Sequence, residues 1–84
     1  MNSIELLTLH NYFKNNFKIN KIPFCTIELI NTSSVKVDGL LEYLEKHKMQ
    51  TEDITKKFNE DESLLSFAII KYTLKKINNQ KPSA

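Results

Sequence analysis

The side chains of this sequence that are best suited to catalysis or metal binding are one cysteine, Cys25, and two histidines, His10 and His47. A thiolate next to a histidine is an activated nucleophile, and both side chains are zinc ligands. Zinc needs three or four ligands held together, but the sequence has no Cys-x-x-Cys or His-x-x-x-His spacing. A nucleophilic site also needs groups that stabilise an oxyanion, and the chain has one glycine and no glycine-rich loop. We therefore expect Cys25 to be a buried thiol on a strand, and we predict no catalytic residue and no metal site.

The carboxylates offer no alternative chemistry. Two pairs, Glu42 with Glu45 and Glu52 with Asp53, fall on the solvated face of one predicted helix and at the start of another. We assign them no acid–base role, because such work needs a positioned side chain beside the reacting group. A phosphate-cradling motif is also absent from the sequence. The sequence therefore predicts a protein that is not an enzyme and binds no cofactor.

Length and charge limit the class of protein further. The 84 residues predict one small domain, 1–84, with a flexible tail at 79–84. The net charge of +2 does not by itself indicate nucleic acid or an anionic membrane as a partner. All twelve basic residues are lysine, so the chain lacks arginine, the side chain that most often reads guanine in DNA.

No segment of the sequence indicates membrane insertion or export. The longest apolar run has four residues, whereas a membrane-spanning helix needs about 20. Residues 1–20 mix charged and apolar residues and lack the continuous apolar region of a secretory signal. A single cysteine excludes an internal disulfide and fits a reducing compartment, so we expect a cytoplasmic protein.

Residues 2–16 have the spacing of an amphipathic helix. Asn2 is placed to cap this helix, with Glu5 three residues later in the capping-box position. We expect the helix to end at Asn15 and Asn16, which tolerate turn geometry, and a connector to follow. Four apolar residues form one stripe at spacings of three and four: Leu6, Leu9, Phe13 and Phe17.

A short β-hairpin is predicted after the connector. A proline followed by alternating apolar and polar residues predicts a strand over 24–30. Turn-forming residues at 31–34 then lead into a return strand at 35–37. The alternative is a helix that begins at Ser34, which is disfavoured because Gly39 is a poor residue for a helix interior.

Three helices are predicted for the remaining chain. Their ranges are 40–48, 51–58 and 59–78. We expect a break at Met49 and Gln50, with Thr51 and Asn59 as the caps of the second and third helices. The predicted fold is therefore α+β and dominated by helices, in the order N-terminal helix, short β-hairpin, three-helix unit.

The last of these helices sets the main constraint on packing. Residues 67–70 are all apolar, and four helical residues at about 100° each cover the whole circumference. The rest of the chain, or a partner, must therefore cover this helix on more than one side. We predict that one of two faces is left to a partner; the alternative is that the chain covers both. The first face is Leu65, Ile69 and Tyr72, and the second is Ile70, Leu74 and Ile77.

Residues 40–77 resemble a helix-turn-helix unit of the winged-helix type. The resemblance lies in an apolar first helix, then Thr51-x-x-Ile54-x-x-x-Phe58, a short turn and a longer helix. It implies that the last helix enters the major groove of DNA and that lysines contact phosphate. Those lysines are Lys56, Lys57, Lys71, Lys75 and Lys76. The chain departs from the family because no wing follows the last helix, and because the acidic Asp61 and Glu62 open that helix.

Two classes of function remain. We expect a small protein-interaction module, acting as an adaptor, inhibitor or regulator, whose partner is another protein or a second copy of the chain. The alternative is a helix-turn-helix transcriptional regulator that binds DNA through the lysines named above.

Overall fold

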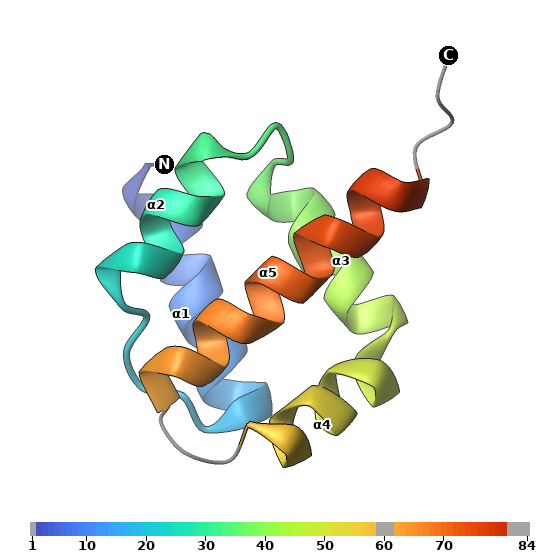
Figure 1. Cartoon of the computed structure of the whole chain (residues 1–84). Helices are drawn as coiled ribbons and strands as arrows, with labels where there is room; N and C mark the ends of the chain where they lie inside the picture. Colours follow the sequence, from blue (N-terminus) through green and yellow to red (C-terminus); the bar gives the residue numbers. More distant parts are fainter. Residues whose placement is uncertain (1, 59–61, 81–84) are drawn as a thin grey trace.

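The chain folds around its last helix, in a computed structural model that describes residues 2–58 and 62–80. The helices of these residues are α1 (Ser3–Phe17), α2 (Phe24–Thr32), α3 (Val37–Lys46), α4 (Lys48–Lys57) and α5 (Glu62–Gln80). Helix α5 runs diagonally across the molecule, with α2 on one side, α4 on the other and α1 behind it (Figure 1). It contacts α2, α3 and α4. The prediction that α5 needs cover on more than one side is thus confirmed.

The hydrophobic core draws on α1, α2, α3, α5 and the segment between α1 and α2. Its buried side chains are Leu9, Phe13, Ile19, Ile22, Ile30, Val37, Leu40, Leu44, Leu65, Ile69, Ile70 and Leu74. Helix α4 adds no fully buried apolar side chain and contributes only the partly buried Ile54. The cover that α4 gives to α5 is therefore thinner than the cover from the other helices.

Helix α1 confirms the prediction for the start of the chain. The Asn2 side chain caps it and accepts a hydrogen bond from the Glu5 backbone N–H at 2.8 Å. The helix runs one residue past the predicted end at Asn15 and Asn16, to Phe17. Lys18 then ends it in the left-handed conformation (φ 57°) and donates its backbone N–H to the Phe13 carbonyl. The predicted apolar stripe faces inward, since Leu9 and Phe13 are fully buried.

The predicted β-hairpin is wrong, and with it the α+β class. The described residues contain no strand, and they form a small all-α fold. The segment predicted as the first strand, 24–30, lies in α2. Pro23 does not block this helix but precedes it, with the Pro23 carbonyl accepting the N–H groups of Thr26 and Ile27. A proline at a helix start loses no hydrogen bond, because the first N–H groups of a helix have no internal partner.

Packing explains why α2 is helical despite its β-branched residues. Thr26 and Ile30 are buried and lie four residues apart, which puts both on the same helix face. The alternation that predicted a strand does not match burial, since Cys25 is exposed instead of being a buried strand thiol. Contact with α5 therefore outweighs the intrinsic β preference of the segment.

The second predicted strand, 35–37, is also wrong, and so is a helix start at Ser34. Helix α3 begins at Val37 and contains Asp38 and Gly39 in its first turn. Gly39 does not have a positive φ, so the fold does not require glycine there.

The predicted break at Met49 and Gln50 is wrong as well. The break between α3 and α4 falls at His47, two residues earlier. Thr51 lies inside α4 and does not cap it, and its hydroxyl donates to the Lys48 carbonyl at 2.7 Å. The expected cap at Asn59 lies outside the described residues, as does most of the expected tail at 79–84. Of that tail, residues 79 and 80 belong to α5.

Two buried threonines differ in the hydrogen bonding of their hydroxyl groups. Thr26 and Thr73 are both fully buried. The Thr73 hydroxyl donates to the Ile69 carbonyl at 2.7 Å, whereas the Thr26 hydroxyl has no hydrogen-bond partner among the described residues. A buried polar group without a partner costs about 1–3 kcal/mol of stability.

We expect Thr26→Val to raise the free energy of unfolding by about 1 kcal/mol, because valine keeps the shape and removes the unpaired hydroxyl. Thr73→Val is the matched control, because it removes a hydroxyl that is hydrogen-bonded, and it should not stabilise the protein. Urea unfolding of the two variants measures both effects. Equal destabilisation by the two substitutions would contradict this interpretation of Thr26.

Candidate functional site

A strongly apolar hollow lies in a groove between α4 and α5. Its lining atoms are almost entirely apolar, and its volume is about 300 Å³. Six residues line it: Ile54, Phe58, Ala68, Lys71, Tyr72 and Lys75. The volume is at the lower limit of ligand pockets, which run from about 300 to 1,000 Å³. It is large enough to receive one or two apolar side chains of a partner.

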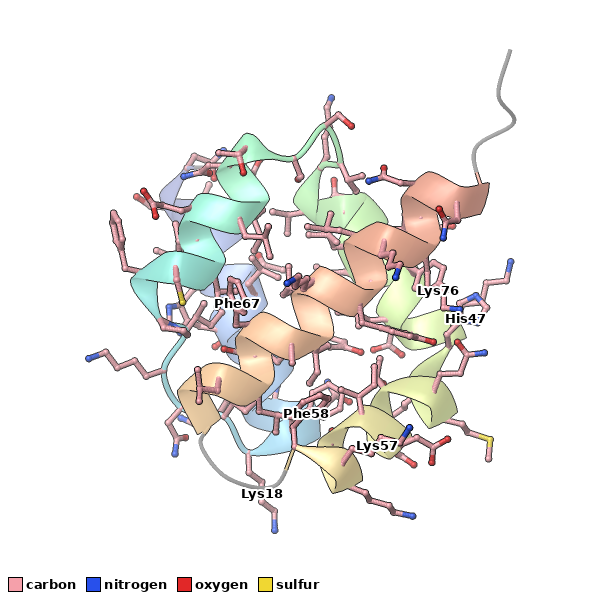
Figure 2. The ribbon with its side chains drawn as sticks, in the orientation of Figure 1. Lys18, His47, Lys57, Phe58, Phe67 and Lys76 are labelled. Atoms are coloured by element: carbon pink, nitrogen blue, oxygen red, sulfur yellow. The ribbon has the colours of Figure 1, made fainter. Side chains whose placement is uncertain are left out.

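Helical spacing brings these residues together. Ile54 and Phe58 are four residues apart at the end of α4, and Ala68 and Tyr72 are four apart on α5, so each pair lies on one face. Phe58 lies between α4 and α5, on the opposite side of α5 from Phe67 (Figure 2). Because the side chain of Ala68 is small, a hollow remains among the larger side chains of Ile54, Phe58 and Tyr72.

Phe58 is the most unusual residue of the groove. It lies four residues after Ile54, a spacing typical of two residues that share a buried helix face, but its side chain is 53% exposed. It is the first residue after α4, and its backbone N–H closes that helix by donating to the Ile54 carbonyl at 3.0 Å. The ring is therefore fixed at the end of a helix while about half of its surface is in contact with solvent.

Tyr72 ties the two walls of the groove together. Its hydroxyl donates a hydrogen bond to the side-chain oxygen of Gln50 on α4 at 2.9 Å. The Lys76 ammonium lies 5.4 Å from the centre of the Tyr72 ring, within cation–π distance. The groove is thus a defined gap between two linked helices.

Lysines surround the apolar lining. Lys71 and Lys75 line the groove from α5, and Lys57 lies next to Phe58 at the end of α4 (Figure 2). All three side chains are exposed, and none of them forms an ion pair with a described residue. The groove is therefore an apolar hollow with two lysines on its α5 wall and a third, Lys57, beside the end of its α4 wall.

The predicted partner residues lie mostly inside the protein. Leu65, Ile69, Ile70 and Leu74 have exposed fractions of 0–8% and pack in the core, so a partner cannot reach them in this fold. Tyr72 and Ile77 are half-buried. Tyr72 lines the groove, and Ile77 lines a different hollow of about 240 Å³ beside His47.

The predicted phosphate-binding lysines do not form one cluster. Lys56 faces away from the groove and lines a hollow between α4 and the end of α1, together with Phe17 and Lys18. Lys71 and Lys75 line the groove, and Lys76 covers the Tyr72 ring.

The cysteine and histidines stay in separate environments. Cys25 is exposed on α2, and His10 is half-buried on α1. His47 stacks on Tyr43, with ring centroids 4.2 Å apart. Within the described part of the chain, no three residues among the histidines, cysteine and carboxylates are grouped so that they could hold a metal ion.

The titratable group of the described residues with the largest pKa shift lies away from the groove. The Tyr12 hydroxyl on α1 is buried and has no hydrogen-bond partner within residues 2–58 and 62–80. Burial, and secondarily the negative charge of Glu45, raises the pKa of Tyr12 from 10.0 to about 12. Burial also raises the pKa of Tyr43, with a smaller contribution from Tyr72. Nothing among the described residues positions Tyr12 to exchange a proton with another side chain, so we interpret its shift as a cost of packing.

We expect this cost to appear as a pH dependence of stability. The folded state favours the neutral phenol, so the contribution of Tyr12 is constant below pH 10 and is lost as the pH rises from 10.0 to about 12. The Tyr12→Phe variant should be at least as stable as the wild type at neutral pH, and it should lose less stability over that window. Urea unfolding of both proteins at neutral pH and at about pH 11 measures the difference. Parallel losses in the two proteins would contradict the assignment.

The comparisons with known proteins give no further guide to the site. No protein-family model, curated protein or solved structure matches this chain. None of the helices in the described ranges combines the length and apolar composition that crossing a membrane requires. Any functional proposal therefore rests on the surface of the molecule itself.

Proposed function

We propose that this chain is a small protein-interaction module that binds another protein through the groove between α4 and α5. The observation that carries the proposal is the half-exposed Phe58 ring beside the apolar side chains of Ile54, Ala68 and Tyr72. Single exposed apolar residues are common on protein surfaces, and Phe24 and Met49 are more exposed than Phe58. Phe58 differs from them because it belongs to a hollow with a continuous apolar lining. Aromatic anchors in such hollows supply most of the binding energy of many interfaces.

A second copy of the chain fits this groove less well than a different protein. In a two-fold symmetric dimer, each residue of the patch faces the same patch on the other copy. The surface that carries Lys71 and Lys75 would then face an equally basic surface, and like charges that meet at an interface are unfavourable. We therefore propose a partner other than the chain itself.

DNA binding is the second candidate. It is supported by the exposed lysines Lys57, Lys71 and Lys75, which form no ion pair with a described residue. The start of α5 supports it less, because Leu65 and Ser66 are buried and Leu64 is an exposed leucine that cannot read base edges. DNA binding also leaves the apolar lining of the groove unexplained, because apolar side chains do not bind phosphate. Protein binding is therefore the better-supported function.

We expect Phe58→Asp to weaken binding at the groove by tenfold or more, because it places a carboxylate in the apolar lining. The probe is a panel of independent peptides selected from a random display library on the wild-type chain, with each affinity measured by calorimetry. Phe24→Asp is the matched control, since Phe24 is also exposed but lies on α2.

The proposal predicts that most of the selected peptides lose affinity for Phe58→Asp and keep it for Phe24→Asp. Circular dichroism should show unchanged helix content in both variants. Peptides that bind Phe58→Asp as tightly as the wild type would contradict the proposal.

A further inference from the structure

The charged residues that line the groove are of one sign, and none of them forms an ion pair with another described residue. Lys71 and Lys75 line the α5 wall, and Lys57 lies outside the lining, next to Phe58 at the end of α4. The other hollows differ in this respect. The one beside His47 is lined by both Glu42 and Lys46. The one between α4 and the end of α1 is lined by Glu52 as well as by Lys18 and Lys56. The groove is the hollow among those described above whose charged lining residues are all basic, so its electrostatic complement is acidic.

The apolar lining limits the backbone conformation of a partner. The groove offers almost no polar atoms, and the described residues form no strand that an extended peptide could pair with. An extended segment would therefore leave its own N–H and C=O groups unpaired against an apolar surface, which is unfavourable. A helix satisfies these groups internally and can lie in a groove between two helices.

The spacing of the lysines also matches a helix. Lys71 and Lys75 are four residues apart, which is about 6 Å along the axis of α5. Carboxylates four residues apart on a second helix repeat at the same distance. A helix that lies along α5 can therefore place one acidic side chain at each lysine while its apolar face contacts Phe58 and Ala68.

From these features we infer that the partner segment is an acidic amphipathic helix. Its apolar stripe enters the groove beside Phe58, and glutamates or aspartates on either side of the stripe contact Lys57, Lys71 and Lys75. This inference rests on the proposed function and adds the charge and the conformation of the partner.

Three synthetic peptides of about 15 residues test the inference, a length at which helices begin to be stable in water. All three carry the same leucine and phenylalanine stripe at helical spacing. The first has glutamates beside the stripe, the second has lysines at those positions, and the third is the acidic peptide with a central proline. We expect the acidic peptide to bind at least tenfold more tightly than the basic peptide, with an affinity that falls as salt concentration rises. The proline peptide should bind at least tenfold more weakly than the acidic one.

Reversing the charge of the two groove lysines gives the most direct test of the acidic partner. In the double variant Lys71→Glu/Lys75→Glu, the preference should invert, so that the basic peptide binds more tightly than the acidic one. Lys21→Glu/Lys36→Glu is the matched control, because both lysines are exposed and lie outside the groove. This control should keep the wild-type preference. Inversion of preference cannot arise from unfolding of the variant, since an unfolded chain would bind neither peptide.

The outcomes separate the two proposals. Equal binding of acidic and basic peptides, with loss of both in Phe58→Asp, would overturn the acidic partner but keep the groove as a binding site. Undiminished binding of the proline peptide would overturn the helical conformation. Tighter binding to a random DNA duplex than to any peptide, unaffected by Phe58→Asp but lost in the charge-reversed variant, would overturn both proposals in favour of DNA.

Discussion

The absence of a polar side chain over one full turn of α5, Phe67 to Ile70, is the constraint on which the rest of the structure depends. A helix with apolar side chains all round its circumference is stable in water only when other elements cover it from several directions. Helices α2, α3 and α4 supply this cover, and Ile69 and Ile70 are fully buried as a result. The cover is uneven, because α4 adds no fully buried apolar side chain. The groove beside Phe58 lies between α5 and α4, the covering helix that adds no fully buried apolar side chain.

Much of the helical structure was predictable, and the main error has a physical cause. The cap at Asn2 and the periodic stripe of α1 depend on local chemistry, which the sequence contains directly. The segment at 24–32 is rich in β-branched residues, and its alternation over a few residues is compatible with either a strand or a buried helix. Contact with α5 decides between the two, and that contact joins residues about 40 positions apart in the chain. The local sequence of residues 24–32 therefore does not reveal whether this segment is a strand or a helix.

The candidate site was predictable in part. The sequence identified α5 as the helix most in need of cover, and Tyr72 is both a predicted partner residue and a lining residue of the groove. The sequence pattern predicts partner contacts for Leu65, Ile69, Ile70 and Leu74 because a small core leaves little cover for two apolar faces, but all four residues are buried. Three helices cover those faces instead. Phe58 was missed because an aromatic residue in helical register with Ile54 normally indicates burial. Its exposure follows from its place at the end of α4, which a periodic pattern does not reveal.

Native-state amide hydrogen exchange tests most directly whether the fold is organised around α5. Amides that exchange only through global unfolding mark the most stable unit of a protein, whereas weakly packed helices open locally and exchange faster. The structure predicts that the slowest amides lie between Leu65 and Leu74, with a free energy of exchange equal to that of global unfolding. The amides of α4 should exchange faster, because this helix adds little to the core. Exchange of the 65–74 amides as fast as those of α4, or slower exchange in α4, would contradict the central position of α5.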